Sequence, residues 1–167
     1  MDSGASSITT IDYPSSADTF SFGINDAGEI VGTYGFGILD HGFLYAGGTF
    51  LGIDVPGAVE TWAHDINSKG QIVGWYLDTS GSHGFLEKNG AFSTIDYPGS
   101  LKTLAYGIND NGAIVGEYEN STTLQFDGFL ETPEASTPEP ASWLLLAAPL
   151  GIAILLARRS TSMRVHA

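Results

Sequence analysis

Short apolar runs separated by turn sequences fill residues 8–131, and helical periodicity is absent before residue 141. Asn25-Asp26-Ala27-Gly28 places Asn first and Gly last in a type I turn, where the glycine supplies a positive φ. This turn predicts a hairpin between a strand that ends at Ile24 and a strand over Glu29–Tyr34. Residues 8–131 are therefore expected to be all-β.

Further turns predict two more strands in the same unit. Ala46-Gly47-Gly48 joins a predicted strand over His41–Tyr45 to one over Thr49–Asp54, and Lys88-Asn89-Gly90 occupies the corresponding place further along. Pro56 then ends the fourth strand, because proline has no N–H to donate to a strand ladder. Each unit thus contains four short predicted strands.

The unit occurs three times with a period of 42 residues. Each copy contains a Gly-Ile-Asn line, a His-Gly-Phe-Leu line and an Ile-Asp-x-Pro line, with Asp in place of His and two inserted residues in the third copy. A period kept this strictly indicates that each unit packs on the next in the same way. The lines fall at Gly23–Gly32, Asp65–Gly74 and Gly107–Gly116; at His41–Leu44, His83–Leu86 and Asp127–Leu130; and at Ile11–Pro14, Ile53–Pro56 and Ile95–Pro98.

Four strands in 42 residues is the size of a β-propeller blade. The sequence therefore predicts an all-β, propeller-like array of three four-stranded repeats over residues 8–131. A lone fourth strand over Ile8–Tyr13 would begin it and a third strand over Gly128–Glu131 would end it, so that the first strand could complete the last blade and make 12 strands. Because propellers typically have about 4–8 blades, three blades would form an open arc, dimerise to complete a ring, or follow further blades upstream.

Charge and composition favour an exported protein. All nineteen Asp and Glu lie before Ala141 against three lysines, so residues 1–140 carry −16 and the remainder +3. This acidic head repels phosphates, and nucleic acid is therefore not expected as a partner. The absence of cysteine excludes disulfides, thiol catalysis and zinc–thiolate sites. Residues 1–7 lack the basic and apolar parts of a secretory leader, so we expect either that the true start lies upstream or that the gene is a fragment, and loss of upstream blades is favoured.

A linker over 132–140, rich in Pro, Glu, Ser and Thr, leads to an uncharged apolar run over Ala141–Ala157. As a helix these 17 residues would extend about 26 Å, just short of a hydrocarbon core of about 30 Å. Trp143 at one boundary and the basic Arg158-Arg159 pair at the other fit a helix whose basic end stays in the cytoplasm. We predict a membrane-targeting hydrophobic helix with a basic end over 141–159.

The tail, with Pro138-Glu139-Pro140 before the apolar run and the arginine pair after it, closely resembles the PEP-CTERM sorting signal of Gram-negative bacteria. The resemblance implies processing near the motif by a membrane protease-transpeptidase, exosortase, and release or transfer to the cell surface. The alternatives are an ordinary C-terminal anchor and a buried core helix. The resemblance assigns the sorting signal to Pro138, Glu139, Pro140, Trp143, Arg158 and Arg159.

The repeat lines over residues 8–131 also resemble the HAF-type extracellular repeat family, on their His-Gly-Phe and Gly-Ile-Asn-x-x-Gly-x-Ile-Val-Gly-x-Tyr patterns. This resemblance implies a surface or secreted bacterial protein and no particular activity. Together with the tail it predicts a non-catalytic exported cell-surface or extracellular-matrix protein. The expected partners are the membrane and an exosortase-type protease, with extracellular polysaccharide and a second copy of the chain as further candidates.

Three sets of repeated polar residues are candidates for chemistry: a metal set, a calcium set in the Asn-Asp turns, and a carboxylate set for acid–base catalysis. The carboxylate set is identical in every copy, which favours a structural role such as bonding the backbone of an adjacent turn. A satisfied polar residue at a strand start explains the histidines, and turn chemistry alone explains the Asn and Gly residues. No Gly-x-Ser-x-Gly line indicates a nucleophile, and we expect neither an enzyme nor a cofactor. The sets are His41, His83 and Asp127; Asn25, Asp26, Asn109, Asp110 and Asn111, with Lys69 breaking the pattern in the second copy; and Asp12, Asp54 and Asp96.

The alternative to a purely structural surface protein is a module that binds glycans or calcium. Aromatic residues are the candidates for glycan binding. Aromatic side chains at fixed places in each blade could stack on sugar rings, although such residues also pack between blades. The candidates for this platform are Tyr34, Trp62, Trp75, Tyr76 and Tyr118.

Overall fold

The computed structural model describes residues 6–133, which form eleven β-strands and contain no helix. Within this range no helix is present that could cross a membrane. The predicted helix over 141–159 lies outside the described residues, as does all but the start of the 132–140 linker. The predicted sorting-signal residues, which also lie outside, are Pro138, Glu139, Pro140, Trp143, Arg158 and Arg159.

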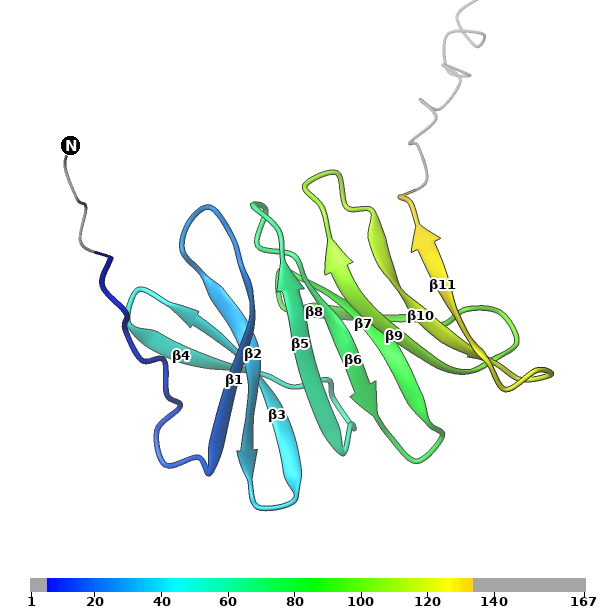
Figure 1. The fold of residues 1–167 in the computed structure, drawn as a ribbon, viewed down its shortest axis with the longest axis horizontal. Helices are drawn as coiled ribbons and strands as arrows, with labels where there is room; N and C mark the ends of the chain where they lie inside the picture. Colours follow the sequence, from blue (N-terminus) through cyan, green and yellow to red (C-terminus); the bar gives the residue numbers. More distant parts are fainter. Residues whose placement is uncertain (1–5, 134–167) are drawn as a thin grey trace, which may run out of the picture. The chain divides into compact units, whose positions relative to one another are not determined.

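Three antiparallel sheets, one for each repeat, share the same connectivity (Figure 1). We call them the N-terminal sheet (β1–β4), the middle sheet (β5–β8) and the C-terminal sheet (β9–β11). Within each sheet every strand pairs with its neighbour in sequence, so hairpins connect them. The strands are β1 (Asp18–Ile24), β2 (Ile30–Phe36), β3 (Leu39–Ala46), β4 (Thr49–Ile53), β5 (Glu60–Ile66), β6 (Ile72–Leu77), β7 (Ser82–Lys88), β8 (Ala91–Ile95), β9 (Ser100–Ile108), β10 (Ile114–Asn120) and β11 (Phe126–Glu131).

The all-β prediction is confirmed, and so are the three repeated sheets, but the predicted strand over Ile8–Tyr13 is wrong. These residues are irregular, and the described chain has eleven strands where twelve were expected. Residues 8–13 have the sequence of a fourth strand, yet no strand ladder includes them among the described residues. The C-terminal sheet accordingly has three strands, and the described part of the chain does not close into a propeller.

The predicted Asn-Gly turns are confirmed, and their geometry explains both residue types. Gly28 has φ +76°, and its N–H donates to the Asn25 carbonyl at 2.9 Å. The Asn25 side-chain oxygen accepts from the N–H groups of Ala27 at 3.1 Å and Glu29 at 3.0 Å. Asn67 and Asn109 make the same turn bonds in the other two sheets. Local hydrogen bonding therefore accounts for the Asn at this position.

A close approach of backbone and ring links two of the repeated sequence lines. A Cβ on Gly74 would overlap the carbonyl oxygen of Trp62 and would come within 2.9 Å of the Phe85 ring. Phe85 is fully buried. Only glycine fits at this place, and the phenylalanine of the His-Gly-Phe-Leu line covers it. The same contact recurs at the equivalent glycines of the other two sheets.

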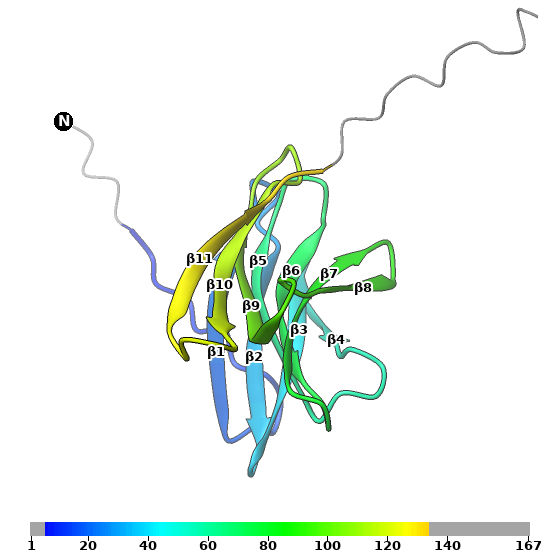
Figure 2. The same ribbon diagram turned by 90° about the vertical axis from the view of Figure 1, so that its right-hand side faces the viewer.

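Neighbouring sheets join through two equivalent interfaces. The first core contains Val31 from the N-terminal sheet with Ile66 and Ile72 from the middle sheet, and the second contains Val73 with Ile108 and Ile114 at the corresponding places. The fourth strands β4 and β8 lie on the same side of the described residues (Figure 2).

Side-chain amides also cross both interfaces. Asn25 Nδ2 donates to the Asn67 carbonyl at 3.2 Å, and Asn67 Nδ2 donates to the Asn109 carbonyl at 3.0 Å. The 42-residue period therefore corresponds to one repeated sheet-to-sheet contact.

Candidate functional site

Aromatic side chains at one repeat position form a line across the first strands of the three sheets. Phe22 on β1, His64 on β5 and Tyr106 on β9 are each 42 residues apart. The Phe22 and His64 rings stack with centroids 4.8 Å apart, and the Tyr106 ring meets His64 edge-on at 5.1 Å. We call these three residues, together with Trp62 and Trp75, the aromatic row. Phe22 and Tyr106 remain substantially exposed, so the row is accessible at both ends.

Two tryptophans extend the row within the middle sheet. Trp62 on β5 and Trp75 on β6 are cross-strand partners, and their rings stack with centroids 5.2 Å apart and an interplanar angle of 14°. Trp62 also stacks on Phe22 at 6.2 Å. The structure thus brings together the two tryptophans that the sequence offered for a sugar platform.

Hydrogen bonds fix the polar edges of this row. The Trp75 indole N–H donates to His64 Nε2 at 3.2 Å, and because an indole can only donate, His64 is neutral in this arrangement. Burial lowers the pKa of His64 against the opposing effect of Asp65. The Tyr106 hydroxyl donates to Glu117 at 2.8 Å, and burial followed by this carboxylate raises the pKa of Tyr106 to about 12.

The row also contains a buried indole N–H. Trp62 Nε1 is buried and makes no hydrogen bond within the described part of the chain. A buried donor of this kind is usually satisfied by a protein group or by water. The exposed rings of Phe22 and Tyr106, with the Glu117 carboxylate beside Tyr106, are a combination that a sugar ring, apolar on its faces and polar at its edge, can use.

The tyrosines that the sequence offered for the platform serve packing instead. Tyr34 and Tyr76 are buried at 6% and 8% exposure. Tyr34 stacks on Tyr13 with centroids 3.5 Å apart, and Tyr118 stacks on Tyr97 at 3.6 Å. Tyr34 and Tyr76 therefore serve packing, the other role expected for aromatic residues at these places, whereas Tyr118 is half-buried beneath Tyr97.

The candidate metal residues His41 and His83 each bind a carboxylate of their own sheet. His41 Nδ1 lies 3.2 Å from Asp54 Oδ1, and His83 Nδ1 lies 2.9 Å from Asp96 Oδ1. Among residues 6–133 no three His, Cys, Asp or Glu side chains come together as metal ligands. The histidines thus connect the third strand of a sheet to the residue that follows its fourth strand.

The candidate carboxylates have side-chain partners, contrary to the expected bond to the backbone of the turn. Asp54 and Asp96 pair with the histidines, whereas Asp12 accepts from the Thr19 hydroxyl at 3.2 Å. They lie in separate repeats, each with its own partner. The calcium candidates are likewise used within the fold. The side chains of Asn25 and Asn109 cap their own turns, as that of Asn67 does in the second copy, and Asp110 Oδ1 accepts from the Ser68 N–H of the neighbouring sheet at 2.9 Å.

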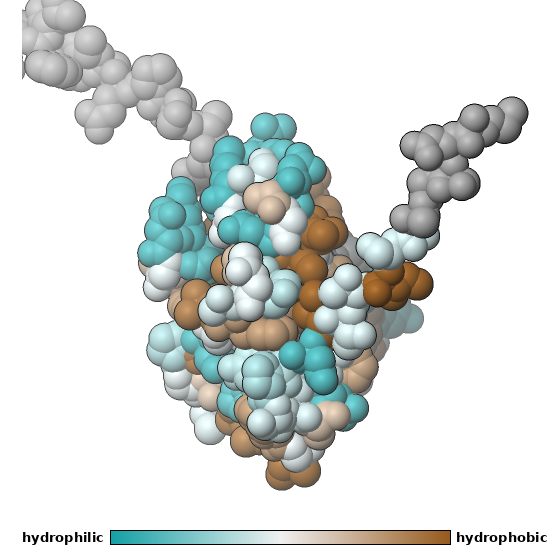
Figure 3. All heavy atoms as spheres, turned by 90° about the vertical axis from the view of Figure 1, so that its left-hand side faces the viewer, coloured by the Kyte–Doolittle hydropathy of each residue, from teal (hydrophilic) through white to brown (hydrophobic). Residues whose placement is uncertain are grey.

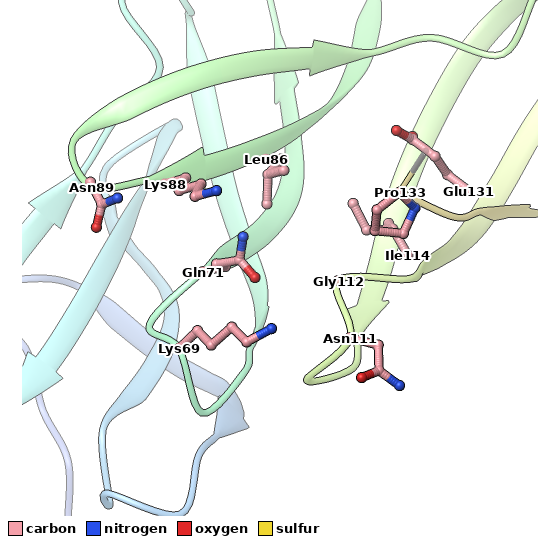
Figure 4. A pocket seen from close by; sticks show the side chains of 10 residues that line it. All are labelled: Lys69, Gln71, Leu86, Lys88, Asn89, Asn111, Gly112, Ile114, Glu131 and Pro133. Atoms are coloured by element: carbon pink, nitrogen blue, oxygen red, sulfur yellow. The ribbon is translucent and has the colours of Figure 1, made fainter. Parts of the chain in front are cut away.

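An open cleft of about 520 Å³ lies between the middle and C-terminal sheets, and Figure 4 shows it between the turn that carries Lys69 and the turn that carries Asn111. Leu86 and Ile114 line its apolar part, and Lys69 and Lys88 line its polar part. A second cleft of about 400 Å³, lined by the equivalent Leu44 and Ile72, lies between the N-terminal and middle sheets. Such clefts are therefore a regular product of the sheet junction.

Sequence reasoning missed Phe22, His64, Tyr106 and Glu117 as site residues. The 42-residue spacing of the first three was visible in the sequence and was the signal that could have found them. Glu117 has the same repeat position as Trp75, and only its contact with Tyr106 identifies it.

No protein-family model matches the chain, and no curated protein or solved structure matches it either.

Proposed function

We propose that the chain is a non-catalytic exported repeat protein of the cell surface or extracellular matrix, sorted by an exosortase-type system. The tripartite tail and the strongly acidic head support this destination. The observation that carries the non-catalytic part is the use of the repeated polar side chains inside the fold. His41 and His83 bind Asp54 and Asp96, and Asn67 caps its turn and bridges two sheets.

Processing of the full chain tests the sorting proposal. In a Gram-negative host that encodes an exosortase, mass spectrometry should find the chain shortened near Pro138–Pro140, and deletion of the exosortase should leave it intact. Glu139→Ala should block the processing, whereas Glu134→Ala, an acidic residue outside the motif, should not. An identical intact mass with and without the exosortase would refute the proposal.

A second candidate function, carbohydrate binding, is favoured by the aromatic row. Phe22, His64 and Tyr106 present rings from three sheets, Trp62 and Trp75 extend them, and Glu117 supplies an acceptor. Aromatic faces beside hydrogen-bonding groups give both contact area and orientation to a bound ring. This module would allow a surface protein to hold extracellular polysaccharide.

A glycan array probed with the full chain, with and without calcium, tests this second candidate. Binding should occur in both conditions and fall at least about tenfold in Phe22→Ala, which removes an exposed ring. Phe126→Ala, an equally exposed ring outside the row, is the matched control and should retain binding. Binding that requires calcium would favour the calcium-binding alternative, and an array without signal in either condition would eliminate the glycan candidate.

A further inference from the structure

The outer face of the N-terminal sheet exposes apolar positions that the other two sheets bury. Ile24 is 66% exposed, whereas its repeat equivalents Ile66 and Ile108 are 3% and 8% exposed. Ile66 and Ile108 are covered because each lies in the core against the preceding sheet. On the side of the N-terminal sheet, hydrophobic surface is visible between polar regions (Figure 3). This face has the chemistry of a sheet junction and has no preceding sheet in the described chain.

The C-terminal sheet shows the complementary pattern on its opposite face. Val31 and Val73 are fully buried against the following sheet, but the equivalent Val115 is 49% exposed. Leu130 is 65% exposed, while Leu44 and Leu86 at the same place pack on the two cores. The two ends of the described array therefore differ. The N-terminal end exposes one side of the sheet-to-sheet contact and the C-terminal end exposes the other side.

The segment before β1 has no strand partner among the described residues. Ile11-Asp12-Tyr13-Pro14 corresponds to Ile53–Pro56 at the end of β4, but residues 8–13 are irregular. The backbone N–H of Tyr13 donates to Thr19 Oγ1 at 3.0 Å, the same bond that Val55 makes to Thr61 at 3.2 Å. The segment thus already contacts the N-terminal sheet as β4 contacts the middle sheet. The described chain provides no strand like β3 for it to pair with.

The C-terminal sheet has the corresponding vacancy in its ladder. β3 and β7 each pair with a fourth strand, whereas β11 pairs only with β10 among the described strands. A strand edge of this kind presents unpaired N–H and C=O groups that another strand can join.

We propose that the C-terminal sheet receives the N-terminal sheet of a second copy of this chain, and that residues 8–13 of this second copy add to β11 as its fourth strand. The contact would repeat the two sheet junctions within the chain, with Ile24 of one copy covering Val115 of the other. Because the two ends of the array differ and fit each other, two chains can join head to tail at both ends and form a closed ring. Such a ring would contain six repeats, a number typical of propellers. This inference does not depend on the sorting or glycan proposals.

One position of the repeat departs from the pattern and makes the register testable. His41 and His83 bind the Asp that follows the fourth strand, but the third copy has Asp127 at that place. In the proposed junction Asp127 would face Asp12 of the second copy, and two carboxylates directly opposite repel each other. The wild-type junction is therefore weakened at this point, and a histidine at position 127 would restore the pair found in the other sheets.

Sedimentation of the full chain in a mild detergent over a range of concentrations tests the junction. The wild type should form dimers in a concentration-dependent manner. Ile24→Lys and Val115→Lys each place a charge in one half of the contact and should each weaken dimerisation at least about tenfold. Both residues are exposed in the single chain, so both variants should keep the far-ultraviolet circular dichroism spectrum of the folded β protein. Ile38→Lys, at a residue 90% exposed in the β2–β3 turn, is the matched control and should dimerise normally.

Mixing the two variants identifies which faces meet. Each variant retains one intact half, so an equimolar mixture of Ile24→Lys and Val115→Lys should recover dimers through a single junction. Loss of dimers in only one variant would indicate a contact between two identical faces and would overturn the proposal. A wild-type chain that stays monomeric up to its solubility limit, or dimers unaffected by both substitutions, would overturn it as well.

Substitution of Asp127 tests the added strand separately. Asp127→His should tighten dimerisation about fivefold, and Asp127→Asn, which only removes the charge, should give a smaller gain. Equal dimerisation of all three chains would show that residues 8–13 do not add beside β11 in the register of the repeat.

Discussion

The middle sheet and the two end sheets have nearly the same sequence pattern and differ in what covers them. The middle sheet has a neighbour on each face, so both Ile66 and Val73 are buried. The N-terminal sheet exposes Ile24 and the C-terminal sheet exposes Val115 at the same two repeat positions. The local sequence therefore determines the hairpins, but the neighbouring sheet determines which apolar residues become core.

This difference has an energetic consequence. In a repeat array each unit is stabilised by its own contacts and by the interfaces with its neighbours. The middle sheet takes part in both described interfaces and each end sheet in one. Equivalent substitutions should therefore cost most in the middle sheet, which gives a direct way to test the comparison.

The largest expected effect is at the phenylalanine that covers the glycine of the second strand. Phe85→Ala removes a fully buried ring from the first core and should lower the free energy of unfolding by about 3–5 kcal/mol. Phe129→Ala, the matched change in the C-terminal sheet, removes a partly exposed ring and should cost clearly less. Urea unfolding followed by circular dichroism measures both values. Equal losses would mean that coverage by a neighbouring sheet does not control stability at this position.

A smaller difference is expected at the asparagines of the turns. Asn67 is 3% exposed, caps its own turn and donates across the junction to the Asn109 carbonyl. Asn67→Ala removes a buried amide and leaves the backbone groups that it binds in two sheets without this partner, and it should cost about 1–3 kcal/mol. The described side-chain bonds of Asn109 stay within its own turn, so Asn109→Ala should cost about 1 kcal/mol. The same urea titration compares them, and a larger loss for Asn109→Ala would contradict the comparison.

The parts of the fold that depend on local chemistry could be predicted from the sequence. Asn25 and Gly28 specify their turn through bonds within five residues, and the 42-residue period specifies three like sheets. The irregular conformation of residues 8–13 could not be predicted, because a strand requires an adjacent strand edge and the sequence of the segment does not show whether one is present.

The candidate site was predictable only in part for the same reason. Trp62 and Trp75 stand out by residue type, and the structure pairs them. Phe22 joins them because two sheets bring together residues 40 positions apart. The burial of Tyr34 depends on Tyr13, which comes from the segment before β1, so the sequence of β2 alone could not separate a packing tyrosine from a surface one.

The smallest expected effect is the pH dependence that His64 gives to the middle sheet, where the end sheets have Phe22 and Tyr106. Burial lowers the pKa of His64 in the folded chain below its ordinary value of 6.5, so the unfolded chain binds more protons between these two values. This contribution to stability is complete above about pH 6.5 and is lost as the pH falls toward the lowered pKa. Because His64 is partly exposed, screening should keep the effect below about 1 kcal/mol.

His64→Phe places in the middle sheet the residue that the N-terminal sheet has at this position. It should remove the contribution of His64 to the change of unfolding free energy with pH, while all other titrating groups contribute equally in both chains. Urea midpoints measured from pH 7.5 to 5 compare the two chains, and parallel curves would show that His64 is protonated as readily in the folded chain as in the unfolded one.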